Sequence, residues 1–128
     1  MTPDVFTAIQ PLMYTSLIVN IAVLLPIVIL MGMRAKVVDG AWGPLTPARG
    51  ILFSIYFSIL ATSVFLLIFP VPVMALALLL VQVLYKVTTP FTVGLKNPVV
   101  ISNLLISVLH ITTISVLFTQ LQWSIRYF

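Results

Sequence analysis

The chain has 128 residues, of which 62% are hydrophobic and only 6% are charged, with a formal net charge of +4. A soluble domain carries about 25% charged residues, so this composition excludes a soluble globular protein. The scattered basic residues do not form the basic face that nucleic-acid binding requires. The absence of cysteine excludes disulfides, thiolate catalysis and iron–sulfur ligation.

Charged side chains are absent from three long intervals of the chain, 5–33, 50–85 and 97–125. A charge at the centre of a bilayer costs at least about 2.5 kcal/mol, so we expect these intervals to lie in lipid. The second interval exceeds the roughly 20 residues of a single span, and Phe69-Pro70-Val71-Pro72 divides it near its middle. The sequence therefore predicts an all-α polytopic membrane protein, a single domain over 1–128 with four transmembrane helices.

In chain order, the first predicted helix covers about 3–33 and is longer than a simple span. Pro11 is expected to separate a short interfacial piece from the span proper, and Pro26 to kink the span. The second and third helices, 47–69 and 72–88, are joined by so short a turn that they must form a tight antiparallel hairpin. Thr89-Pro90 is expected to end the third helix. The fourth covers 98–122.

Helix starts repeat one pattern, a capping residue followed by proline, at Thr2-Pro3, Thr46-Pro47 and Asn97-Pro98. Thr and Asn accept a hydrogen bond from a free backbone N–H, and proline at the first helical position loses none. The two basic loops that carry such caps hint that the first helix pairs with the second and the third with the fourth.

Orientation follows from the basic residues, because all except Arg126 lie in or beside loops 34–46 and 89–97. The positive-inside bias places these loops in the cytoplasm. We therefore expect both termini outside, in what we take to be a bacterial cytoplasmic membrane. In this interpretation Lys86 only flanks the second basic loop. Segment 34–49, with Trp42 at the interface, is expected to be an ordinary ordered connector, and docking of a partner is the alternative.

The fourth predicted helix carries Asn103, Ser107, His110 and Thr113 on one face. An ionisable residue within a membrane is a functional hypothesis by default. His110 could ligate a haem or chlorophyll, relay protons or contact a transported substrate. The alternative, which we expect, is a structural hydrogen bond to a backbone carbonyl or to Asn20 or Gln82, with no cofactor.

Two further polar features lie within the spans. Ser54, Ser58 and Thr62 are spaced four apart and predict close helix packing within the chain, with contact to another subunit as the alternative. Asn20 and Gln82 are isolated amides that are costly in hydrocarbon unless paired. We expect both to point inward and bond between helices, or else to line a polar pore.

The sequence contains no recognisable combination of catalytic residues. The only acids, Asp4 and Asp39, lie outside the predicted spans, so there is no carboxylate pair, no Ser/His/Asp arrangement, no metal-ligating cluster and no phosphate loop. We therefore expect neither an enzyme nor a metal site.

Two functions remain open. The first is a non-catalytic accessory or structural subunit of a larger membrane complex, for which a bioenergetic assembly is one candidate. The alternative is a small homo-oligomeric transporter or channel with a polar path along Asn103, Ser107 and His110. The expected partners are the lipid bilayer and other membrane subunits or further copies of the chain.

Overall fold

The computed structural model describes the backbone of residues 3–126 and the side chains of residue 4 and residues 6–121. Its elements are α1 (Pro3–Gly32), the 3-10 helix η1 (Lys36–Val38), α2 (Asp39–Trp42), α3 (Pro47–Ile68), α4 (Pro72–Thr92) and α5 (Pro98–Arg126). The four long helices are each long and apolar enough to cross a membrane. The predicted four-helix membrane fold is therefore confirmed, and no strand occurs within 3–126.

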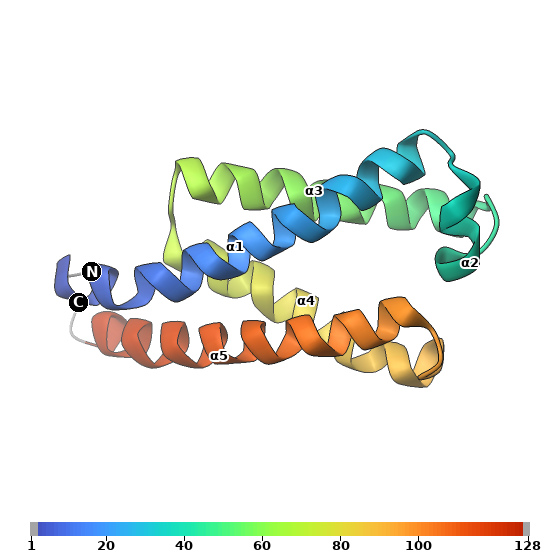
Figure 1. Cartoon of the computed structure of the whole chain (residues 1–128). Helices are drawn as coiled ribbons and strands as arrows, with labels where there is room; N and C mark the ends of the chain where they lie inside the picture. The colour runs from blue at the N-terminus through green and yellow to red at the C-terminus, as the bar shows by residue number, and fades with distance from the viewer. Residues whose placement is uncertain (1–2, 127–128) are drawn as a thin grey trace.

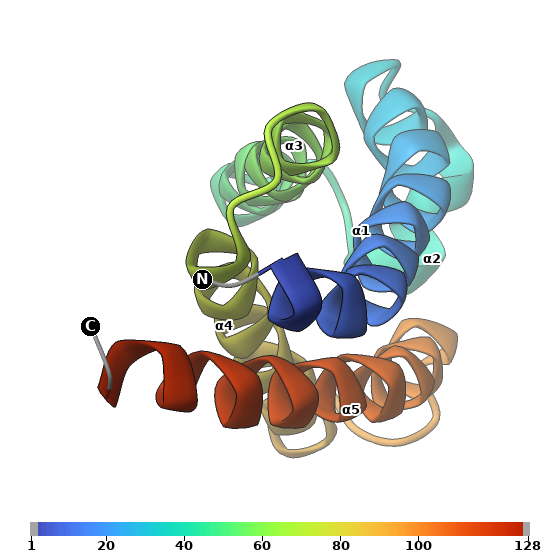
Figure 2. The same cartoon turned by 90° about the vertical axis from the view of Figure 1, so that its left-hand side faces the viewer.

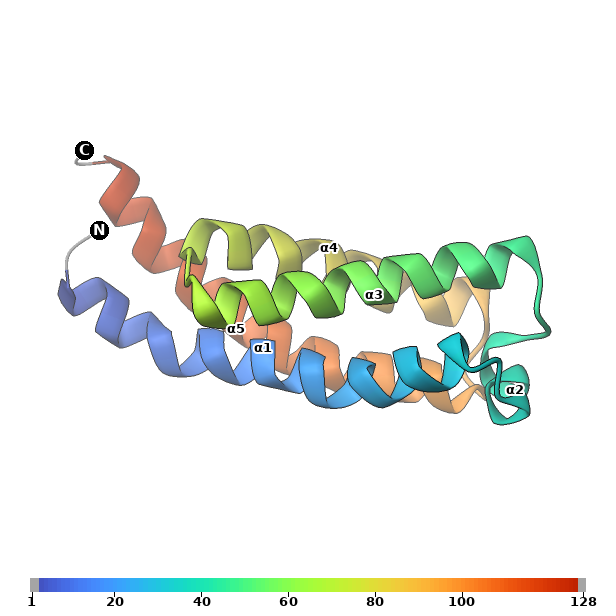
Figure 3. The ribbon, with the colours of Figure 1, turned by 90° about the horizontal axis from the view of Figure 1, so that it is seen from above.

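The long helices run along one another, with the start of α1 and the end of α5 at one end of the bundle (Figure 1). The opposite end carries α2 and the α4–α5 connection, and the view from above agrees (Figure 3). We call these the terminal end and the loop end. This arrangement is what the predicted topology requires. The assignment of the loop end to the cytoplasm stays a prediction.

Helix packing follows two pairs, α1 with α3 and α4 with α5, and α1 also contacts α5. The pairing expected from the two basic loops is thus confirmed. The predicted short connection between α3 and α4 is present at Phe69–Val71. Beyond that connection these two helices make few contacts with each other, and they lie apart from one another in the end-on view (Figure 2).

Three prolines do not interrupt their helices, which corrects the predicted boundaries. α1 continues through Pro11 and Pro26, and α4 continues through Pro90 to Thr92 instead of ending at 88. Proline removes one hydrogen bond, and a helix in lipid can continue where the freed carbonyl finds another donor. At Pro90 that carbonyl belongs to Lys86, and the Thr89 hydroxyl donates to it over 2.7 Å.

The fourth predicted helix is also longer than expected. α5 reaches Arg126 instead of ending at 122, because the segment 122–126 contains neither proline nor glycine to stop it.

The predicted caps of the second and fourth spans are confirmed. Thr46 accepts from the Arg49 backbone N–H over 3.3 Å, and Asn97 accepts from the Val99 backbone N–H over 2.8 Å. Both bonds satisfy N–H groups that have no partner within their own helix. Thr2 lies outside the described residues.

Loop 34–46 is an ordered connector, as predicted, and contains η1 and α2. Arg49 forms an ion pair with Asp39 and donates to the Gly43 carbonyl over 2.8 Å. Asn97 donates to the Ala41 carbonyl over 2.9 Å, which ties α2 to the start of α5. α2 is therefore held against the loop end of the bundle.

The apolar core lies in clusters along the bundle. One cluster towards the terminal end holds Ile9, Leu79, Leu117 and Leu121, and the largest lies between α1 and α3. Because lipid tails are as apolar as these side chains, their burial does little to select which helix faces meet. Polar contacts between the helices therefore select which helix faces meet.

Candidate functional site

A set of polar side chains lies in the interior of the bundle. The buried polar and charged residues come from all four long helices and are Ser16, Asn20, Arg49, Ser63, Gln82, Lys86, Asn103, Ser107, His110 and Thr113. The set includes the whole polar face predicted for α5 and both predicted amides. Apart from Arg49, which holds α2, we call this set the polar column.

The middle of the polar column joins three helices through one amide. Asn20 accepts a hydrogen bond from His110 Nε2 over 2.9 Å, because its Oδ1 atom cannot donate. The same side chain donates to the Ser63 hydroxyl over 3.1 Å, and Ser63 donates to the Ile59 carbonyl over 2.7 Å. This chain of bonds links α5, α1 and α3.

A second interhelical contact lies in the part of the column towards the terminal end. The hydroxyls of Ser16 and Thr113 lie 2.7 Å apart and join α1 to α5. The sequence analysis overlooked Ser16, although it stands four residues before Asn20 and so shares its helical face. Ser63 was also overlooked, because it directly follows the more regular series that ends at Thr62.

Two fully buried atoms of the column lack a hydrogen-bond partner among the described residues, namely Gln82 Oε1 and His110 Nδ1. The Gln82 amide reaches only the Leu78 carbonyl of its own helix, over 3.5 Å. The predicted interhelical bond is therefore present for Asn20 but not for Gln82. Buried polar groups without partners are rare in folded proteins and call for an explanation.

Lys86 is a further candidate site residue, which was not predicted from the sequence. It lies six positions before the end of α4, about 9 Å along the helix axis, and only 4% of its surface is exposed. No described residue forms a hydrogen bond or ion pair with its ammonium group, which lies over the Tyr85 ring at 5.9 Å from the centroid, the distance of a weak cation–π contact. Its spacing of four from Gln82 could have indicated that both face inward.

A cavity of about 290 Å³ lies beside Lys86 at the loop end. Its lining comes from every helix and consists of Val23, Leu24, Ile27, Ala41, Trp42, Tyr56, Tyr85, Lys86, Pro98, Val99, Ser102 and Asn103. A second cavity of about 470 Å³ shares Trp42, Tyr85 and Asn103 with it and extends under α2. We call the two together the loop-end cavity.

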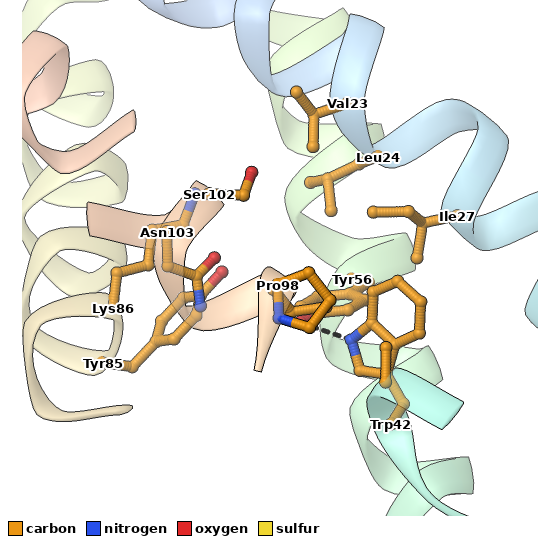
Figure 4. A pocket seen from close by; sticks show the side chains of 12 residues that line it. Val23, Leu24, Ile27, Trp42, Tyr56, Tyr85, Lys86, Pro98, Ser102 and Asn103 are labelled. Carbon is orange, nitrogen blue, oxygen red and sulfur yellow. Dashed lines mark hydrogen bonds between the residues drawn. The ribbon is translucent and has the colours of Figure 1, made fainter. Parts of the chain in front are cut away.

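The polar and apolar groups of the loop-end cavity occupy opposite walls. Figure 4 shows Lys86 and Asn103 on one side, with Val23, Leu24 and Ile27 of α1 facing them. Trp42 donates to the Tyr56 hydroxyl over 3.2 Å at the border. Apolar walls with a few convergent polar groups are typical of small-molecule sites.

The residues predicted for helix packing lie elsewhere. Ser54 and Ser58 are exposed and donate to carbonyls of their own helix. With Thr62 they line a groove of about 400 Å³ between α3 and α4. The expected close packing within the chain is therefore absent, since α3 and α4 diverge there, and contact with another subunit stays a prediction.

His110 is buried in the bundle and forms an interhelical hydrogen bond. Its side chain is 0% exposed, and Nε2 is already used by Asn20. An axial ligand of haem or chlorophyll would need this face of α5 open to the ring, so the residues around His110 do not fit such a group. No set of three metal-ligating side chains occurs in the described part of the chain.

The candidate site is thus a polar column that is hydrogen-bonded towards the terminal end and widens into a cavity at the loop end. Its distinguishing group is the unpaired ammonium of Lys86. Comparisons with protein families, with curated proteins and with solved structures find no match to this chain.

Proposed function

We propose that this integral membrane protein is a small transporter whose solute path follows Asn103, Ser107 and His110. The observation that carries the proposal is the asymmetry of the bundle interior. The path is a cavity at the loop end and is sealed by hydrogen-bonded side chains towards the terminal end. Alternating access requires a site that is open to one side of the membrane and closed to the other.

The polar contacts that close the half of the bundle towards the terminal end are individually weak. The interhelical hydrogen bonds there are those of Asn20 with His110 and Ser63, and of Thr113 with Ser16 and the Leu12 carbonyl. Interhelical hydrogen bonds within membranes stabilise by about 0.6 kcal/mol on average. A polar solute or water can replace such bonds one for one, so these bonds add little to the barrier to opening beyond the separation of the apolar cluster of Ile9, Leu79, Leu117 and Leu121.

The unpaired groups of the interior favour transport over a purely structural subunit. A protein that only fills space in a complex gains nothing from burying Lys86 and the Gln82 carbonyl without partners, because each costs free energy. The subunit prediction depends on the apolar outer surface, which lipid covers equally well. One bundle of four helices is narrow, so the proposal includes assembly of two or more copies.

Uptake into liposomes tests the proposal. Purified protein is reconstituted and supplied with labelled erythritol, choline or butanesulfonate, which are small neutral, cationic and anionic solutes that cross lipid slowly. We expect uptake of at least one solute above that of protein-free liposomes, and a reduced rate in Asn103→Leu. Ser115→Ala is the matched control, since Ser115 is exposed on the lipid-facing side of α5.

Uptake no faster than in protein-free liposomes for all three solutes would reject the proposal. Comigration with larger membrane proteins in a gentle detergent would then support the subunit function. Unchanged uptake in His110→Ala would remove that residue from the path while leaving the transporter intact.

A further inference from the structure

The loop-end cavity carries an inference about the class of ligand. We propose that Lys86 binds a singly charged oxyanion whose apolar part lies against α1. This deepens the proposed function, since it names the substrate class, but binding is measurable whether or not transport occurs.

The charge of Lys86 has no counterpart within the chain. The protein has only two acidic residues. Asp39 borders the cavity, but its carboxylate is paired with Arg49, and Asp4 belongs to the first turn of α1 at the opposite end. An isolated buried ammonium is strongly disfavoured. Lys86 lines the loop-end cavity, so an anionic ligand bound there would supply the negative charge that compensates it.

Neutral donors stand beside this ammonium. Asn103 is 8% exposed, borders both parts of the cavity, and its side-chain amide has no hydrogen-bond partner among the described residues. Ser102 adds a hydroxyl to the same wall (Figure 4). An ammonium with an amide N–H and a hydroxyl is a donor set for an oxyanion, and charge-assisted bonds of this kind are about twice as strong as neutral ones.

The apolar wall of the cavity and its single cation further restrict the chemical class of the ligand. Val23, Leu24 and Ile27 form the wall opposite Lys86, so an apolar group on the ligand is accommodated. One cation compensates one negative charge, which favours a monoanion over a dianion such as free phosphate. Two sources share this chemistry, namely a small carboxylate or sulfonate from water and the phosphodiester of an anionic lipid.

Tryptophan fluorescence provides the binding measurement, because Trp42 lines the cavity and Trp123→Phe removes the second indole. In phosphatidylcholine nanodiscs this protein is titrated with butanesulfonate, which stays anionic, and with uncharged butanol. We expect saturable binding of butanesulfonate only. Lys86→Met should weaken it by about tenfold or more, and Lys86→Arg should retain it. Lys96→Met, which removes an exposed lysine at the same end, should bind as the parent does.

Phosphatidylglycerol nanodiscs distinguish the two sources. If the ligand is the lipid, butanesulfonate should no longer bind in these nanodiscs. Native mass spectrometry should then show phosphatidylglycerol retained by the parent but not by Lys86→Met. Unchanged butanesulfonate binding identifies the free solute. Equal affinity of the parent and Lys86→Met for butanesulfonate, with no Lys86-dependent retention of lipid, overturns the inference. Circular dichroism and gel filtration confirm that Lys86→Met is folded.

The experiments can reject either of the two proposals without rejecting the other. Solute uptake that Lys86→Met leaves unchanged would retain the transporter and overturn the anion site as its substrate site. Lys86-dependent binding without uptake of any solute would retain the anion site and reject transport.

Discussion

His110 Nε2 and Asn20 Oδ1 lie 2.9 Å apart although 90 positions separate them in the sequence. The bond joins α5 to α1 in the interior of the bundle, and Asn20 extends it to Ser63 on α3. Because apolar contacts select helix faces weakly in lipid, this three-helix contact determines how α1, α3 and α5 are rotated against each other.

Substitution of the central amide should therefore destabilise the fold. We expect Asn20→Leu to lower the free energy of unfolding by about 1–2 kcal/mol, since it leaves both His110 and Ser63 without their partner. Unfolding in increasing mole fractions of sodium dodecyl sulfate, followed by circular dichroism, measures the change. The effects of Asn20→Leu and His110→Leu should be less than additive in the double variant.

The control for this pair is Thr112→Ala, because Thr112 is exposed and donates only to the Val108 carbonyl of its own helix. It should change the free energy of unfolding by less than about 0.5 kcal/mol. Additive effects of Asn20→Leu and His110→Leu would show that the two side chains do not interact in the membrane.

Absorption spectroscopy tests the pigment interpretation of His110. We expect the protein, purified from cells able to make haem and chlorophyll, to lack a Soret or chlorin band, because the imidazole is buried and bonded to Asn20. A band that disappears in a folded His110→Leu variant would contradict this expectation and establish ligation.

Lys86→Met should raise the stability of the unliganded protein. The substitution replaces an unpaired buried ammonium with an apolar chain of similar length, so we expect a gain of about 1 kcal/mol or more in the free energy of unfolding. Sodium dodecyl sulfate titration measures it beside Lys96→Met, which should be neutral. A stability lower than that of the parent would mean that Lys86 has a structural partner in the membrane.

The topology can be tested cleanly because the chain has no cysteine. Gly40→Cys, where an added Cβ meets nothing within 4 Å, lies at the loop end, and Pro70→Cys lies in the α3–α4 turn. With an impermeant maleimide on intact cells, we expect labelling of position 70 alone, and of position 40 only after permeabilisation. Labelling of both from one side would reject the four-span topology, and the reverse order would invert the orientation.

The sequence by itself determined the number of the spans and their approximate positions. The cost of a charge in lipid is a property of each segment, so the charge-free intervals and the Pro70–Pro72 turn were sufficient to locate four helices. The caps at Thr46 and Asn97 were equally predictable, because a cap bonds to the backbone two or three positions further along. That Asn103, Ser107 and His110 share one face also followed from spacing alone.

Only the tertiary structure decided what each face meets. Spacing places His110 on a stripe of α5, but the neighbour of that stripe depends on helix rotation, which packing sets. Lys86 is the clearest case. The Thr89 hydroxyl satisfies its carbonyl and lets α4 continue through Pro90, so a residue that looked like the margin of a loop lies inside the bundle. The loop-end cavity also depends on the docking of α2, which rests on the contact of Asn97 with the Ala41 carbonyl 56 positions away and is not encoded in local sequence.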